Sequence, residues 1–277
     1  MRRAQGRAVE GRRQEEHGRV IAPGRALEAR WLGTRPYPEM LSVQEELVSL
    51  RQAGEIPDTL LLLEHPPTYT LGRRSEPSDR AGLELEGESA VVETPRGGRI
   101  TWHGPGQLVA SPIVDLKGIG DQPGTAARVD VAGFVASLEQ AMVASLEEWG
   151  VEARPIEGLT GIWTSDPGAI PPGAEAATVA PAIADGAVRK IGSIGLRISR
   201  GVTSHGISLN LSCDLGPFDR IEACGIDGCR MTSVEEEVGS APSPEEAGLT
   251  FHRALAGELD LEPTLPESSP ADSILSP

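Results

Sequence analysis

The stretch that decides the fold is residues 189–211, RKIGSIGLRISRGVTSHGISLNL. It reads as two strands, Arg189–Ser199 and Val202–Leu211, which Arg200-Gly201 joins in a tight hairpin turn. Apolar residues alternate with polar or small ones along the second strand, which is typical of a strand with one buried face. The residues expected to share a face are His205, Ile207, Leu209 and Leu211.

Further strands and helices are predicted on both sides of this hairpin. Short runs bounded by Gly and Pro predict strands at Ala26–Leu32, Thr59–Glu64, Ala90–Glu93, Arg99–Trp102 and Gln107–Val114. Helical spacing of apolar residues predicts helices at Tyr37–Arg51, Arg128–Trp149 and Pro244 to about Leu259. Strands in runs with flanking helices predict an α/β (α+β) fold with mixed, largely antiparallel sheets.

Two helix starts carry capping signals. Thr232 and Glu235 have the spacing of a capping box, in which the cap hydroxyl and the acid satisfy two backbone amides. Ser243, followed by Pro244 and two acids, has the composition of a capped first turn. Both sites are therefore expected to begin helices.

The 277 residues suit one large domain with irregular ends. Residues 1–25 mix Arg and Glu with little apolar periodicity, so we expect a disordered extension. Residues 26–261 form the single predicted domain. Within it, residues 165–186 are rich in Pro, Ala and Gly and are expected to be a surface insertion loop. Residues 262–277, rich in Pro and Ser, are expected to be a flexible tail.

Composition excludes several classes of protein. A net charge of −16 argues against nucleic-acid binding, and an acidic protein partner would need a local basic patch. No window approaches the roughly 18 consecutive apolar residues of a membrane span, and no signal peptide is evident, so a cytoplasmic location is expected. Three cysteines in such a chain are expected to be free thiols.

The basic residues are skewed towards arginine. Of 25, only Lys117 and Lys190 are lysines. Arginine stays protonated at any working pH, whereas a lysine can exchange a proton. Lys117 lies in a Gly-rich turn and needs no special explanation. Lys190 begins the hairpin, where small residues leave room beside it, and is a candidate for proton transfer.

Two other segments could carry chemistry. Residues 96–107 contain four glycines, which would let the backbone approach a ligand, although a Gly-rich hairpin turn would look the same. Cys224-Gly225 lies in a polar loop, a suitable setting for a reactive thiol, although most single cysteines are small buried hydrophobes. A metal site built from the three cysteines and His205 is disfavoured because no Cys-x-x-Cys pair is present.

Taken together, four motifs resemble those of the octanoyl-[acyl-carrier-protein]:protein N-octanoyltransferases, a family within the lipoate- and biotin-protein ligase superfamily. The motifs are Arg96–Gln107, Lys190–Gly195, His205–Asn210 and Cys224-Gly225, in that order. The resemblance extends to Glu64–Arg73 and Gly158–Trp163 and spans about residues 30–235. Ala223 stands where that family commonly has a proline.

The resemblance implies a mixed α/β fold around an acyl tunnel. It implies transfer of an octanoyl group from acyl carrier protein to a lysine of a lipoyl domain, without ATP, metal or another cofactor. Cys224 would form the acyl-thioester intermediate, and Lys190 would favour its thiolate and later accept a proton. The implied acceptors are lipoyl domains of 2-oxoacid dehydrogenase complexes and the glycine cleavage H protein, with no nucleic acid or membrane partner.

The resemblance also implies the residues that bind substrate. They are Arg96, Gly97, Gly98, Arg99, Ile100, Thr101, Trp102, His103, Ser193, Ile194, Gly195, Gly206, Ile207 and Ser208. Glycine amides would bind the thioester carbonyl, and Ile194 and Ile207 would line the acyl chain. Because acyl carrier protein is acidic, we expect a basic rim. Its expected members are Arg73, Arg74, Arg96 and Arg189.

Two rival functions remain at this point. An ATP-dependent lipoate- or biotin-protein ligase would share the fold, but it needs an adenylate-binding motif and no nucleophilic cysteine. A non-catalytic acyl-binding module would use the glycines only to shape a pocket. Dependence on ATP would identify the first, and absence of an acyl group on Cys224 would identify the second.

Overall fold

The computed structural model describes residues 25–81, 83, 90–117, 119, 129–222, 228–265, 268 and 271–275. Their main feature is a nine-stranded sheet in the order β12-β1-β2-β6-β10-β9-β8-β7, with β11 beside β9. The strands are β1 (Ala26–Thr34), β2 (Asp58–Glu64), β6 (Gln107–Ile113), β7 (Ala153–Ile156), β8 (Leu159–Ser165), β9 (Val188–Ser199), β10 (Val202–Asn210), β11 (Arg230–Met231) and β12 (Glu262–Thr264). Pairing is parallel for β1 with β2 and β12 and for β9 with β11, and antiparallel elsewhere. The predicted mixed, largely antiparallel fold is confirmed.

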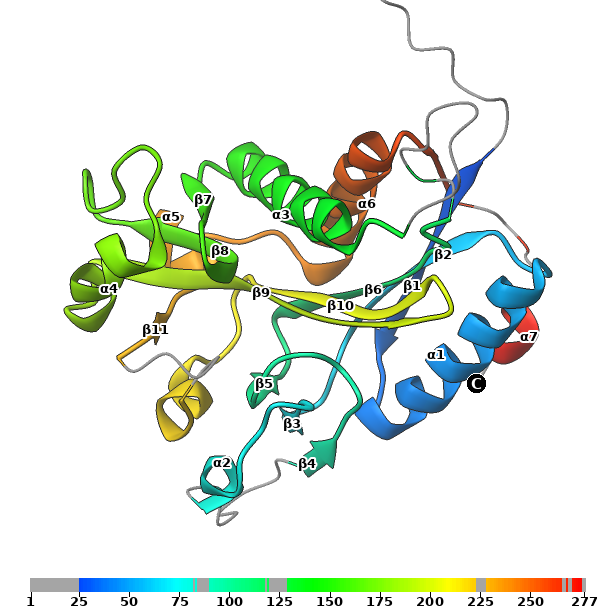
Figure 1. Ribbon diagram of the computed structural model, residues 1–277, viewed down its shortest axis with the longest axis horizontal. Helices are drawn as coiled ribbons and strands as arrows, with labels where there is room; N and C mark the ends of the chain where they lie inside the picture. The colour runs from blue at the N-terminus through cyan, green and yellow to red at the C-terminus, as the bar shows by residue number, and fades with distance from the viewer. Residues whose placement is uncertain are drawn as a thin grey trace, which may run out of the picture.

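Helices and a second sheet cover the two faces of this sheet (Figure 1). On one face lie α3 (Val131–Glu148) and α6 (Pro244–Leu259). On the other lie α1 (Tyr37–Ala53), α7 (Asp272–Leu275) and a small sheet of β4 (Ala90–Glu93), β3 (Thr68–Leu71) and β5 (Thr101–His103). The remaining elements are α2 (Pro77–Ala81), α4 (Ala176–Ala184), the 3₁₀ helix η1 (Gly216–Arg220) and α5 (Val234–Val238).

The central strands are buried on both faces, which explains their long apolar runs. In β2, Leu60 and Leu62 pack in the core under α3 and α6, whereas Leu61 and Leu63 pack with Leu47 of α1. Successive strand residues point to opposite faces, so four consecutive leucines serve two separate cores.

In β6 and β10 the side chains on one face are larger than those on the other, and the small side chains leave room for a site. Leu108 and Ala110 of β6 and Leu209 of β10 pack under α3 and α6. The intervening positions on the α1 side include Ser111 and Ser208, which are small. The sheet is therefore hollowed on the side that faces α1 and the small sheet.

The hairpin that anchors the sheet forms as predicted. Strands β9 and β10 pair in antiparallel register from Gly192·Leu209 to Ser199·Val202. The two connecting residues both have positive φ, 51° at Arg200 and 94° at Gly201. A two-residue turn with two left-handed residues matches the right-handed twist of the strands it joins.

Two segments predicted to be irregular contain regular structure. Residues 165–186, expected to be a loop, include α4, whose Val179 and Ile183 are buried against Trp163. In the expected tail, β12 pairs with β1 and α7 packs on α1. These short elements were not predicted, because they depend on a neighbouring surface that periodicity does not reveal.

Smaller differences concern element ends. Arg25 forms an ion pair with Asp58, whereas residues 1–24 lie outside the described residues. The predicted capping box at Thr232 is displaced by one residue, because Ser233 caps α5 through the amide of Glu236. The capping box at Ser243 is confirmed. Within the described parts of the chain, no helix is long and apolar enough to cross a membrane.

Candidate active site

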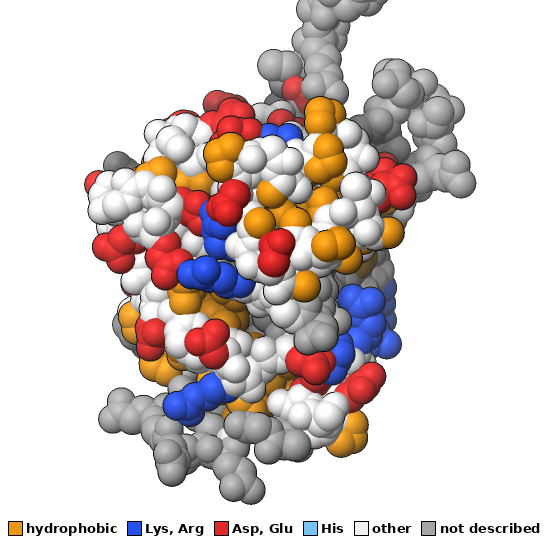
Figure 2. Space-filling view, turned by 90° about the vertical axis from the view of Figure 1, so that its left-hand side faces the viewer, with side chains coloured by type: hydrophobic (Ala, Val, Ile, Leu, Met, Phe, Trp, Pro, Cys, Tyr) orange, Lys and Arg blue, Asp and Glu red, His pale blue; other side chains and the backbone are white. Residues whose placement is uncertain are grey.

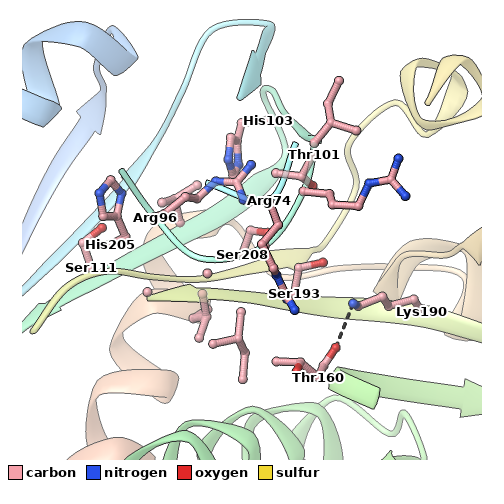
Figure 3. Close-up of a pocket in the computed structure, with 18 of the residues that line it drawn as sticks. Arg74, Arg96, Thr101, His103, Ser111, Thr160, Lys190, Ser193, His205 and Ser208 are labelled. Atoms are coloured by element: carbon pink, nitrogen blue, oxygen red, sulfur yellow. Dashed lines mark hydrogen bonds between the residues drawn. The ribbon is translucent and has the colours of Figure 1, made fainter. Parts of the chain in front are cut away.

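A cavity of about 270 Å³ lies between the hollowed face of the large sheet, α1 and the small sheet. Most of the residues predicted to bind substrate line it (Figure 3). They are Arg96, Gly98, Arg99, Ile100, Thr101, His103, Ser193, Ile194, Gly195, Gly206, Ile207 and Ser208, together with Lys190. Cys224, the predicted nucleophile, lies outside the described residues, which stop at Glu222 and resume at Gly228.

Lys190 stands at one end of the cavity, and its side chain is held from two sides. Only 1% of the residue is exposed. Its Nζ donates to the carbonyl of Thr160 at 2.8 Å and lies 5.1 Å from the centre of the Trp163 ring. Both contacts suit an amine that carries positive charge, because a carbonyl oxygen and an aromatic face are both electron-rich.

The loop that supplies Thr160 requires a glycine. Gly161 has φ of +107°, and a Cβ there would lie 2.4 Å from the carbonyl oxygen of Gly192 and 2.8 Å from Cε of Lys190. Its amide donates to Glu139 of α3 at 3.2 Å. Burial raises the pKa of the Glu139 carboxyl, and the positive charge of Lys190 opposes that rise. Glu139 therefore helps to fix the loop that holds Lys190.

Arg96 is the buried cation of the cavity, with 6% of the residue exposed. Its Nη2 donates to the carbonyl and the hydroxyl of Thr70 at 2.6 and 2.7 Å, and Nη1 donates to the carbonyl of Gly97 at 2.9 Å. Gly195 makes this packing possible, because a Cβ there would lie 3.0 Å from Cδ of Arg96. The guanidinium is thus held by neutral oxygens against the floor of the cavity.

Uncharged aromatic side chains surround Arg96. The ring of Tyr37 lies 4.6 Å from that of His65 and 5.5 Å from that of His103, measured between centroids. Burial lowers the pKa of His65 to about 4 and, together with the charge of Arg96, that of His205 to about 4. Burial, with His65 and Arg96, lowers the pKa of His103 well below its usual range. At neutral pH these imidazoles are uncharged.

A hydrogen-bonded chain links this group to the strand beside Lys190. His103 Nδ1 lies 2.7 Å from Oε1 of Gln107, whose amide donates to Oδ1 of Asn210 at 2.9 Å. Asn210 donates in turn to the carbonyl of Thr232 at 2.9 Å, and the amide of Thr232 donates to the carbonyl of Lys190. Gln107 and Asn210, the last residues of two motifs, therefore join the cavity wall to β9.

His205 departs from the predicted alternation. On the pattern of β10 it should share the face of Ile207 and Leu209 under α3 and α6. Instead its φ is +55°, and its Nδ1 lies 3.4 Å from the hydroxyl of Tyr37 on the opposite side. Its amide donates to Oε1 of Gln44 at 2.7 Å. A left-handed backbone is strained in a non-glycine strand residue. At His205 this backbone conformation directs the imidazole into the cavity instead of the core.

Some of the residues predicted to bind substrate lie outside the cavity or also pack in the core. Trp102 points away from the cavity and packs edge-on against Phe218 at 5.6 Å. Gly97 does not line the cavity, and its amide donates to the carbonyl of Leu196. Ile194 and Ile207 border the cavity, yet both also pack in the core under α3 and α6.

The predicted basic rim is only partly present. Arg73 and Arg74 are exposed, and Arg74 lines the cavity. Arg96 is buried, so its inclusion in the rim was wrong. Arg189 is paired with both Glu237 and Asp166. On the face shown in Figure 2, basic and acidic side chains alternate.

The described residues offer no metal site, and one of their two thiols, Cys213, is buried. Among the residues whose placement is described, no group of three or more His, Cys, Asp and Glu side chains could hold a metal ion. Cys213 is buried, and burial raises the pKa of its thiol to about 12. A thiol with so high a pKa is a poor nucleophile at neutral pH.

Sequence reasoning missed several lining residues. Tyr37 and Gln44 come from α1, and Ser111 comes from β6. The predicted helix gave no sign of which face would meet the sheet. His65 also lines the cavity. The one available signal was that His65 lies in a segment that takes part in the family resemblance.

Comparison with known proteins gives a consistent result. The sequence model described as "Lipoyl protein ligase A/B catalytic domain" matches residues 36–256. The chain is 40% identical over 235 residues to a protein of Mycobacterium leprae named octanoyltransferase, covering 85% of this chain and 88% of the relative. It is 41% identical over 234 residues to the protein of that name from Mycolicibacterium smegmatis, covering 84% and 90%.

A solved structure agrees on the fold. The structure of a protein of T. acidophilum, described as a putative lipoate protein ligase, matches with a TM-score of 0.63. The match covers 90% of this chain and 92% of that chain at 15% sequence identity. At so low an identity the likeness establishes the architecture, and the relatives of higher identity bear on the activity.

Proposed function

The chain belongs to the octanoyltransferases of the lipoyl protein ligase A/B catalytic domain family, and on that premise we propose that Cys224 and Lys190 carry its transfer reaction. The acyl donor is octanoyl-acyl carrier protein and the acceptor is a lysine of a lipoyl domain. We also propose a cytoplasmic location, where thiols stay reduced.

The reaction would proceed in two balanced steps. In the first, the Cys224 thiolate attacks the thioester carbonyl, a new carbon–sulfur bond forms, and the phosphopantetheine thiolate leaves and takes its proton from the Lys190 ammonium, which becomes a neutral amine. In the second, the acceptor amine attacks the acyl-enzyme, an amide forms, and the Cys224 thiolate leaves while the amine proton passes to Lys190. Neither step needs ATP or a metal ion, because the donor thioester is already activated.

The observation that carries the proposal is the position of Lys190. It lies at one end of the cavity, with its Nζ fixed by Thr160 and Trp163. Strand β11 begins at Arg230, soon after Cys224 in the sequence. Its Met231 pairs with Lys190 of β9. The described chain that follows Cys224 in the sequence therefore returns to β9 beside Lys190.

The cavity residues have separate proposed tasks. Ser193, Gly195, Gly206 and Ser208 supply a floor of small residues on which an acyl chain can lie. Arg96, which packs on Gly195, and His103 are fixed by Thr70 and Gln107 and line the cavity beside that floor. Arg73 and Arg74, both exposed, would meet the acidic carrier protein.

The decisive test is intact mass spectrometry of the purified protein after incubation with octanoyl-acyl carrier protein without ATP. Wild type should gain the mass of one octanoyl group, and Cys224→Ser should gain none as a thioester. Cys213→Ser, which changes a buried thiol, is the matched control and should still gain the group. No adduct on wild type would overturn the covalent mechanism, and an adduct that needs ATP would favour a ligase.

A further inference from the structure

The cavity is one part of a longer groove along the same two strands. On the α1 side of β9 and β10, the register pairs Ser193 with Ser208 and then Gly195 with Gly206, and all four residues line the cavity. The next pair on that side is Arg197 with Ser204. Those two residues line a second groove of about 300 Å³.

Two residues line both spaces, Gln44 and His205. His205 reaches this position only because of its left-handed backbone, which turns the imidazole away from the core face occupied by Ile207. Gln44 holds the His205 amide at 2.7 Å, and the Tyr37 hydroxyl lies 3.4 Å from its ring. In Figure 3, His205 and Ser111 lie at the end of the cavity opposite Lys190 and Thr160.

We propose that the His205 imidazole, fixed by Gln44 and Tyr37, is the wall that limits acyl-chain length, and that the groove beyond it is a latent site for the distal part of longer acyl chains. This inference rests on the proposed function, because it takes the acyl chain to run from Lys190 along the floor towards His205.

The dimensions of the second groove and the apolar residues along part of it fit this role. Its volume is similar to that of the cavity, so it could receive a chain extension of comparable size. Leu41, Val48 and Pro95 supply apolar surface along it, next to polar and charged residues that include Glu45, Arg197 and Arg200. The wall itself is uncharged at neutral pH, because the pKa of His205 is lowered by burial, and a neutral imidazole can face a terminal methyl group.

The test compares octanoyl and dodecanoyl thioesters of acyl carrier protein as donors, with the initial rate of Cys224 acylation followed by intact mass. His205→Gly removes the imidazole and keeps a residue that tolerates the positive φ. The ratio of dodecanoyl to octanoyl rates should rise by about tenfold or more, the scale on which pocket size discriminates between chains. Gln44→Ala, which frees the His205 amide, should raise the ratio in the same direction and serves if His205→Gly is poorly folded.

Two further variants make the test specific. Ser49→Trp places bulk in the second groove, so His205→Gly combined with Ser49→Trp should lose the gain. Leu209→Ala removes volume from the opposite face of the same strand, at a residue that lines neither space, and should leave the ratio unchanged. An unchanged ratio in folded His205→Gly or Gln44→Ala, or an increase confined to Leu209→Ala, would overturn the proposal that His205 is the wall. Absence of any octanoyl adduct on wild type would instead overturn the proposed function.

Discussion

At the scale of single residues, the role proposed for Lys190 requires a lysine, in a chain whose basic residues are nearly all arginines. A buried arginine could stabilise a nearby thiolate, but it could not take up and release a proton at working pH. The contacts to the Thr160 carbonyl and the Trp163 ring hold the amine at one place. The second half-reaction should therefore depend on the residue type more than the first.

Replacing Lys190 with arginine separates the two half-reactions. In Lys190→Arg the positive charge is kept, so Cys224 should still become acylated, whereas transfer to the lipoyl domain should slow by about 10²- to 10⁴-fold, the usual contribution of a positioned base. Single-turnover mass spectrometry would show the acyl-enzyme accumulating. Lys190→Met, which loses charge and base together, should impair both steps. An acyl-enzyme that discharges at the wild-type rate in Lys190→Arg would exclude proton transfer by Lys190.

At the scale of elements, β8 approaches β9 so closely at Gly161 that no side chain fits between them. A Cβ there would collide with the Gly192 carbonyl and with Lys190, and φ is positive. Gly161→Ala should lower the free energy of unfolding by about 1–3 kcal/mol and displace Thr160, with a large loss of transfer activity. Gly168 is the matched control, because its φ of +80° is similar but nothing lies within 4 Å of a Cβ.

Urea unfolding and steady-state transfer rates would measure both variants. Gly168→Ala should lose part of the stability, through backbone strain alone, and keep its activity. If the two variants lose activity equally, crowding against Lys190 is not the cause. If only stability differs, the loop does not position Lys190.

The elements also show what the sequence can and cannot predict. Strong local signals were sufficient for the β9–β10 hairpin, because alternation and a two-residue turn act over neighbouring residues. They were insufficient for α4 and β12, which are stabilised by Trp163 and by the edge of β1 respectively. His205 illustrates the same limit within the site. Its alternation was regular in sequence, and only the contacts with Gln44 and Tyr37 reveal why the backbone departs from it.

The four motifs could be assigned to one site only through resemblance, since residues 96–107 and 205–210 are far apart in the chain. For three of the motifs the described residues show a physical link. Gln107 and Asn210 hydrogen-bond each other, and Asn210 reaches Thr232 beside β9. The helix α1 was predicted, but the residues of it that line the cavity were not. Helical periodicity marks an apolar face and does not show what that face will contact.

At the scale of the whole molecule, the large sheet separates the main hydrophobic core on one face from the candidate site on the other. The face under α3 and α6 is filled by large apolar side chains, whereas the opposite face is hollowed and lined by polar groups. Three of those groups are histidines kept neutral by burial, His65, His103 and His205, and His252 is a fourth buried histidine with a lowered pKa. Such groups make stability depend on pH, because the unfolded chain can protonate them and the folded chain resists protonation.

The sign follows from the direction of these shifts. Each folded-state pKa lies below the unfolded value of about 6.5, so the stabilisation is complete above pH 6.5 and is lost as the pH falls towards about 4. In that window the free energy of unfolding should fall by about 1.4 kcal/mol per pH unit for each such histidine. Urea unfolding from pH 7.5 to about pH 5 would measure the slope. His65→Gln removes one titrating group and should reduce that slope by about 1.4 kcal/mol per pH unit, the contribution of one proton. A stability that stays flat across this range would mean that the histidines are already accessible to protonation in the folded protein.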